Sequence, residues 1–160
     1  MAQAGSAERG AGVRFPPPLV FLFSLLSGVA VDRYWMAAPL PIEPTIRMTL
    51  GMLVALSGFS LLLSSRIHFK RTGQSVSPWK PTPELIFRWP YTFTRNPMYV
   101  GMTLVEIGLG IALNNRWIAA FAVPALLLVH FIAVLPEEKY LSEKFGDSYR
   151  TYLTKVRRYL

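Results

Sequence analysis

Three long stretches of the chain are apolar and almost free of charge. Residues 48–65 and 117–136 contain no Asp, Glu, Lys or Arg, and residues 96–115 contain only Glu106. A helix needs about 20 predominantly apolar residues to cross the hydrocarbon core of a bilayer. Each stretch therefore predicts one membrane-spanning helix. We place these spans at about residues 46–65, 97–115 and 117–136.

A fourth, shorter apolar stretch lies near the N-terminus. It covers residues 19–31 and is followed by Asp32, Arg33 and two aromatic residues. We interpret residues 17–36 as a first span, with the charged pair near one interface and the aromatic pair in the interfacial belt. A cleaved signal peptide is the alternative, because basic residues precede the stretch and small residues end its apolar core.

The positive charges are distributed unevenly between the connecting segments. Of 17 Lys and Arg residues, all but Arg33, Arg47 and Arg116 lie in the N-terminal tail, in the loop between spans two and three, or in the C-terminal tail. In a protein with four spans these three segments share one side of the membrane. The positive-inside rule then places both termini and the loop in the cytoplasm. The basic residues of the N-terminal tail are Arg9 and Arg14.

The composition agrees with a membrane protein and excludes several other classes. The chain is 52% hydrophobic and 16% charged, whereas soluble domains contain about 25% charged residues. The absence of cysteine excludes disulfides, thiolate metal sites and a cysteine nucleophile. Because the two histidines are far apart, we expect no metal site. The net charge is +8, and the charged residues lie between the apolar stretches rather than along one helix face. We therefore expect the lipid bilayer as a partner and no nucleic acid.

The loop of residues 66–96 is rich in proline and aromatic residues, which is unusual for a solvated segment. We predict that it lies on the membrane face or re-enters the membrane, where protein must bury its backbone. A plain amphipathic anchor at the interface is the alternative. The residues concerned are Pro78, Trp79, Pro81, Pro83, Trp89, Pro90, Tyr91 and Phe93.

This loop runs into the sequence Arg95-Asn96-Pro97-Met98-Tyr99 at the start of the third span. Pro97 suits the first turn of a helix, where a missing N–H costs little. The free N–H groups of that helix end, beside Arg95, favour an anionic group of a ligand. Ordinary helix capping with an arginine that reaches the interface is the alternative.

The third span carries an acidic residue near its middle. Tyr99, Thr103 and Glu106 are spaced i, i+4 and i+7, so they share one helix face. A carboxyl group inside a membrane is costly and is therefore a candidate functional residue. A protonated or hydrogen-bonded structural glutamate is the alternative.

The fourth span contains Pro124, which predicts a kink, and a single histidine. His130, Val134 and Glu137 are again spaced i, i+4 and i+7, which predicts that His130 faces the same way as the acidic pair Glu137-Glu138. His130 is thus a candidate for proton transfer. A packing role is the alternative.

Residues 137–156 predict an amphipathic helix at the interface, with one interruption. Gly146 ends its first part and Asp147 caps its second. Tyr149 and Tyr152 continue an apolar stripe. The whole chain, residues 1–160, is thus predicted to be one all-α membrane domain with about four transmembrane helices, a cytoplasmic re-entrant or interfacial loop and a C-terminal amphipathic helix.

Two linked motifs lie on either side of the helical hairpin formed by spans three and four. They consist of Tyr91, Arg95, Asn96, Pro97, Tyr99 and Gly101, then Glu137, Glu138, Leu141, Phe145, Gly146, Tyr149 and Tyr152. With this spacing they resemble the isoprenylcysteine carboxyl and phospholipid methyltransferases, a family of integral membrane methyltransferases. The resemblance covers the chain from about residue 83 onward.

The resemblance implies S-adenosylmethionine as the cofactor, held between residues 78–101 and 137–156. The methyl acceptor would be lipophilic or membrane-associated: an isoprenylcysteine-like carboxylate, a phospholipid amine or a thiol. An amine must lose a proton, so Glu106 and His130 are the candidate catalytic residues. The implied cofactor positions are Pro83, Glu84, Leu85, Ile86, Tyr91, Arg95, Asn96, Pro97, Met98, Tyr99, Glu137 and Glu138.

The chain departs from the eukaryotic carboxyl methyltransferases at two positions. Asn96 stands where they have histidine, and Ala133 stands where they have a substrate-binding arginine, which argues against a prenylcysteine carboxylate. Sterol reductases end in a similar hairpin, but they bind a nicotinamide cofactor and have many more spans. A non-catalytic membrane scaffold or lipid-binding protein is the other alternative.

Overall fold

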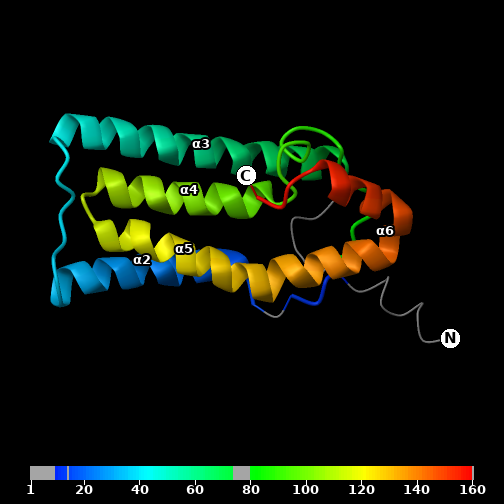
Figure 1. Cartoon of the computed structure of the whole chain (residues 1–160), viewed down its shortest axis with the longest axis horizontal. Helices are drawn as coiled ribbons and strands as arrows, with labels where there is room; N and C mark the ends of the chain where they lie inside the picture. The colour runs from blue at the N-terminus through cyan, green and yellow to red at the C-terminus, as the bar shows by residue number, and fades with distance from the viewer. Residues whose placement is uncertain (1–9, 14, 74–79, 160) are drawn as a thin grey trace. The chain divides into compact units, whose positions relative to one another are not determined.

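The chain is all-helical over the residues that the computed structural model describes, which are 10–13, 15–73 and 80–159. These ranges contain no β-strand and a single isolated bridge. The predictions on Arg9, Arg14, Pro78 and Trp79 lie outside them. In chain order the helices are α2 (Pro17–Tyr34), α3 (Pro44–Arg71), α4 (Pro97–Ala112), α5 (Arg116–Val129), the π-helix η1 (His130–Val134) and α6 (Leu135–Lys155) (Figure 1).

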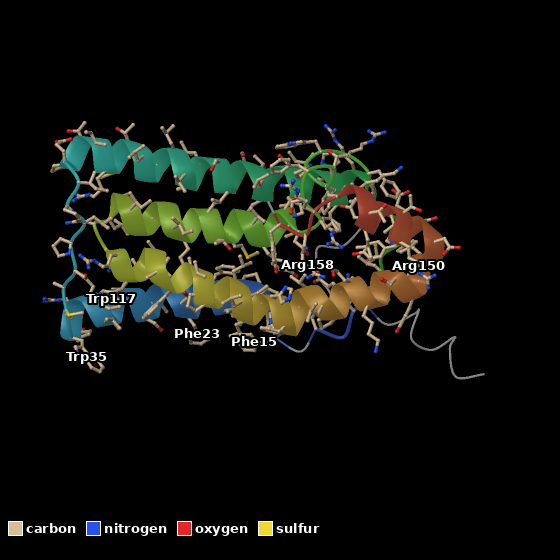
Figure 2. All side chains as sticks on the ribbon, viewed as in Figure 1. Phe15, Phe23, Trp35, Trp117, Arg150 and Arg158 are labelled. Carbon is tan, nitrogen blue, oxygen red and sulfur yellow. The ribbon has the colours of Figure 1, made fainter. Side chains whose placement is uncertain are left out.

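Two of these helices are long and apolar enough to cross a membrane. They are α3 and the continuous helix Arg116–Lys155, in which α5, η1 and α6 follow one another, while α4 is a shorter apolar helix. The prediction of an all-α membrane protein is confirmed. Two boundaries differ from the prediction: α3 continues to Arg71, and the fourth helix runs on without a break in the chain into the amphipathic α6. Figure 2 shows Phe23 of α2 and Trp35, which follows the end of α2, pointing outward, as expected for apolar side chains that face lipid or its interface.

The chain forms two compact units. The bundle unit comprises Pro17–Leu62 and Met98–Val129, and the tail unit comprises Met1–Pro16, Leu63–Pro97 and His130–Leu160. Most of the predicted cofactor positions belong to the tail unit, whereas Met98 and Tyr99 belong to the bundle unit. The catalytic candidate Glu106 also belongs to the bundle unit.

Glycines bring the helices of the bundle unit into close contact. A Cβ atom on Gly58 would lie 2.6 Å from the carbonyl oxygen of Gly101, and one on Gly28 would lie 2.7 Å from the backbone of Ile118. Both distances are shorter than any tolerable contact, so only glycine fits. Small residues at such contacts let helices in a membrane gain van der Waals packing along their backbones.

The turn between α4 and α5 is tight and is formed by Asn114 and Asn115. Asn114 has a φ of 60°, a left-handed conformation that asparagine tolerates better than most residues. The Asn115 side-chain oxygen accepts hydrogen bonds from the backbone N–H groups of Trp117 and Ile118, at 3.0 and 3.1 Å. Asn115 is therefore the N-cap of α5.

The helix changes geometry at His130–Val134, where it is π-helical. Pro136 lies just beyond, in the first turn of α6, where it cannot donate a backbone hydrogen bond and its ring would crowd the preceding turn of a regular α-helix. The wider π-turn relieves that conflict. It also changes the angle between successive residues, so the i, i+4, i+7 relation assumed for His130, Val134 and Glu137 does not apply unchanged across this segment.

Gly146 interrupts α6, as predicted. Its φ of 51° and ψ of −125° are not helical, and glycine adopts a positive φ without steric cost. Beyond the interruption, Tyr149 and Tyr152 are buried. The helix ends at Lys155, and the following segment pairs with the loop through the bridge between Arg157 and Thr94.

Candidate functional site

The tail unit brings the two predicted motifs together through their tyrosines. The Tyr152 hydroxyl donates a 2.6 Å hydrogen bond to the carbonyl oxygen of Tyr91. Phe69 contacts the Tyr91 ring edge-on, and Phe87 contacts Tyr152 in the same way. The loop and the second half of α6 thus form one aromatic cluster.

These phenols are neutral at physiological pH. Burial raises the pKa of Tyr91, opposed by a hydrogen bond with Ser65 and reinforced by the charge of Glu137. Burial raises the pKa of Tyr152 to about 12, which the charge of Arg95 partly opposes. The cluster therefore offers uncharged aromatic surface with hydroxyl groups, and the influence of Glu137 on Tyr91 places that carboxylate within electrostatic reach of the cluster.

Glu138 is held by two arginines. Its Oε1 atom lies 3.2 Å from Nη1 of Arg95 and accepts a 3.0 Å hydrogen bond from Nε of Arg158. Its Oε2 atom accepts a 2.7 Å bond from Nη2 of Arg158. The side chains of Glu138 and Arg95 are only 13% and 12% exposed. A bidentate, charge-assisted contact of this kind fixes both partners in orientation.

The loop residues next to Arg95 are bound to the end of the chain. The Thr94 hydroxyl and the Asn96 side-chain amide each donate to the carbonyl oxygen of Arg158, both at 3.0 Å. The Arg95 backbone N–H donates to the carbonyl oxygen of Arg157 at 2.9 Å. The predicted motif Arg95-Asn96 is thus built against residues 156–159, which we call the C-terminal clasp.

The clasp also reaches His130. The hydroxyl of Tyr159 lies 2.8 Å from Nδ1 of His130, and the two rings contact each other. His130 therefore belongs to the same unit as Glu137 and Glu138, although the helical spacing that predicted its placement does not apply unchanged.

The predicted loop positions 83–86 lie beside α6 rather than among the buried residues. The backbone N–H of Thr82 donates to the Tyr140 hydroxyl at 3.2 Å, which attaches this part of the loop to α6. Pro83 and Glu84 are exposed, whereas Leu85 and Ile86 are half-buried.

Glu106 belongs to the bundle unit. It is 3% exposed, and its Oε1 atom accepts a 2.6 Å hydrogen bond from the Ser24 hydroxyl of α2. Its Oε2 atom is buried and has no hydrogen-bond partner among the described residues. Tyr99 and Thr103 are buried as well, in agreement with a shared helix face.

A model of the family described as phospholipid methyltransferase matches residues 46–148. The chain belongs to the phospholipid methyltransferase family. It is also 35% identical over 63 residues to an uncharacterized protein of Haemophilus influenzae, a match that spans 39% of this chain and all of that protein. Membership of this family makes the chain a membrane methyltransferase and confirms the resemblance on which the cofactor positions were predicted.

The family match contains the loop, the helical hairpin and the acidic pair, but it ends before the clasp. Thr94, Arg157, Arg158 and Tyr159 are the site residues that sequence reasoning missed. Their partners are remote in the sequence: Thr94 and Arg158 are 64 positions apart. The basic residues near the C-terminus were the only available signal, and they indicated an interfacial charge rather than a contact.

Proposed function

We propose that the protein transfers a methyl group from S-adenosylmethionine to a lipophilic acceptor in the membrane. The observation that carries the proposal is the assembly of both predicted motifs in one unit: Tyr91, Arg95 and Asn96 from the loop, and Glu137, Glu138 and Tyr152 from α6. The family to which the chain belongs supports the methyl transfer itself.

The residues of the tail unit fit the chemistry of this cofactor. Nε of Arg95 is a buried donor without a partner among the described residues, and a guanidinium group suits a carboxylate. Glu137 suits an ammonium group or ribose hydroxyls. The neutral rings of Tyr91 and Tyr152 suit an adenine ring or a cationic sulfonium. Because Glu138 is engaged by two arginines, its role in this proposal is to position Arg95 rather than to bind the cofactor.

The bound cofactor supplies an activated methyl group on a good leaving group, so positioning and exclusion of water account for most of the rate that the protein must provide. The chain's own residues orient the cofactor and, for an amine acceptor, remove a proton. His130 and Glu106 are the candidates for that proton transfer. A thiolate or carboxylate acceptor needs no such base.

The acceptor belongs to the class of lipids or other lipophilic molecules that approach from the bilayer. Ala133 is fully buried and offers no charge where the carboxyl methyltransferases have arginine, which favours an amine or a thiol over a prenylcysteine carboxylate. We further propose that the cofactor site faces the cytoplasm, since the flanking segments carry most of the positive charge.

The proposal is tested by calorimetry of S-adenosylmethionine binding to the protein in lipid nanodiscs. We expect wild type to bind, and we expect Tyr91→Ala and Glu137→Ala to lose at least tenfold in affinity while they keep their helical circular dichroism. Arg150→Ala is the matched control, because Arg150 is exposed on α6 and pairs with Asp147, which is also exposed. The absence of binding to well-folded wild type would favour the non-catalytic scaffold instead.

A further inference from the structure

The C-terminal clasp contacts the loop motif with its main chain. Arg157 forms a parallel bridge with Thr94 and accepts a hydrogen bond from the backbone N–H of Arg95, and the carbonyl of Arg158 accepts from the side chains of Thr94 and Asn96. Thr94 and Asn96 are almost completely buried. Polar groups buried to this extent are costly unless they are paired, so the loop motif depends on the clasp to satisfy its hydrogen bonds.

The clasp contacts the acidic pair with a side chain. The Arg158 guanidinium forms two hydrogen bonds with Glu138, whose other charged neighbour is Arg95. Arg158 is the more exposed of the two arginines, at 38% against 12% for Arg95. Arg158 therefore connects the two motifs at once: its carbonyl binds the loop and its guanidinium binds α6.

We propose that the clasp completes the methyl-donor site and that Arg158 is a positioning residue for it. The Arg158 side chain acts through Glu138, because it fixes the carboxylate that orients Arg95. Its main-chain carbonyl holds the Asn96 amide of the loop motif. This role rests on the proposed function, because it concerns the binding of the same cofactor. The site is then built from three segments distant in sequence, the loop, α6 and the clasp, rather than from the two motifs alone.

A purely structural role makes a different prediction. If the clasp only stabilised the tail unit, Arg158 variants would unfold more easily but bind the cofactor normally in the folded state. A positioning role predicts weaker binding in protein that is demonstrably folded, and recovery when a guanidinium group is returned to its place.

The test is calorimetric binding of S-adenosylmethionine and of its demethylated product, S-adenosylhomocysteine, to Arg158→Ala, Arg158→Lys and wild type in nanodiscs. We expect at least a tenfold loss of affinity in Arg158→Ala for both molecules. Arg158→Lys keeps the charge without the bidentate geometry, so we expect a smaller loss. Added ethylguanidinium should restore binding to Arg158→Ala, because the position is partly open to solvent. Arg150→Ala (Figure 2) is the control of the same residue type and should bind as wild type does.

Two failures are distinguishable. Equal affinity of wild type and Arg158→Ala, or a loss that neither lysine nor ethylguanidinium reduces, would overturn the positioning role while leaving the proposed function intact. An absence of cofactor binding by folded wild type would overturn the proposed function itself. If Arg158→Ala does not fold, Arg158→Lys still decides the question, since wild-type affinity in that variant excludes a need for the bidentate contact.

Discussion

Glu137 and Glu138 are adjacent in the sequence but have different surroundings. Glu138 is held by Arg95 and Arg158, whereas Glu137 acts electrostatically on Tyr91. Neighbouring residues of a helix point in directions about 100° apart, so an acidic pair readily divides its roles. In this site we assign the positioning of Arg95 to Glu138 and direct contact with the cofactor to Glu137.

This division predicts different effects on stability for two matched substitutions. Glu138→Gln removes the charge between two guanidinium groups, and breaking a buried ion pair from one side costs about 3 kcal/mol. We expect Glu138→Gln to lower the thermal unfolding midpoint clearly, as followed by intrinsic tryptophan fluorescence. Glu137→Gln leaves the ion pairs of Glu138 with Arg95 and Arg158 in place, so it should lower the midpoint less than Glu138→Gln does while it weakens cofactor binding directly. Equal midpoints for the two variants would contradict the assignment.

Glu106 allows a second prediction at this scale. Glutamine keeps an oxygen that accepts the Ser24 hydrogen bond, so Glu106→Gln should preserve the fold. If Glu106 accepts a proton from an amine, the variant should methylate a lipid amine about 100-fold more slowly and a lipid thiol at nearly the wild-type rate. Methyl transfer from labelled S-adenosylmethionine to the two acceptors measures this. Unchanged amine methylation would leave Glu106 with a structural role only.

At the scale of elements, the sequence predicted what local pattern determines. The absence of charge over residues 48–65 and 117–136 located two helices, and Gly146 located the interruption of α6. The π-helix was missed because its cause, Pro136, lies beyond the segment that it distorts. The clasp was missed because nothing local to residues 156–159 indicates a contact with the loop.

The glycine contacts of the bundle unit predict that the two sides of α3 differ strongly in how well they tolerate substitution by alanine. A Cβ on Gly58 would lie 2.6 Å from the backbone of α4. The helix α3 cannot move away from α4 without losing the other contacts between the two helices. We expect Gly58→Ala to destabilise the protein by about 1–3 kcal/mol. Ser57→Ala on the exposed side of the same turn should have little effect. Thermal unfolding in the same nanodiscs compares them, and equal midpoints would show that the close contact is not required.

At the scale of the whole molecule, the buried phenols predict loss of stability at alkaline pH. In the unfolded chain a tyrosine has a pKa of about 10, while burial raises the pKa of Tyr152 to about 12 and raises those of Tyr91 and Tyr149 as well. Above about pH 10 the unfolded state therefore binds fewer protons than the folded state, so the free energy of unfolding falls as the pH rises. The stabilising contribution is complete below pH 10 and is lost progressively above it.

Thermal midpoints measured at about pH 9 and about pH 11 check this expectation. Wild type should lose stability between the two values, and Tyr152→Phe should lose less, because it has one titrating phenol fewer. The comparison uses the difference between the two pH values within each variant, so the cost of removing the hydrogen bond to Tyr91 cancels. An identical pH dependence would mean that Tyr152 titrates as it does in water.

The orientation of the chain in the membrane is the last property that the charge distribution predicts. Three predicted spans lie between Ala37 and Asp147, so the two residues should lie on opposite sides, with Asp147 in the cytoplasm. Since the chain has no cysteine, single variants Ala37→Cys and Asp147→Cys, both at exposed positions, carry one reactive thiol each. A membrane-impermeant maleimide applied to intact cells should label Ala37→Cys, and Asp147→Cys only after permeabilisation.

The reverse pattern would invert the proposed orientation. Labelling of both from one side would require an even number of crossings between them, which would remove the shorter helix α4 from the set of membrane spans.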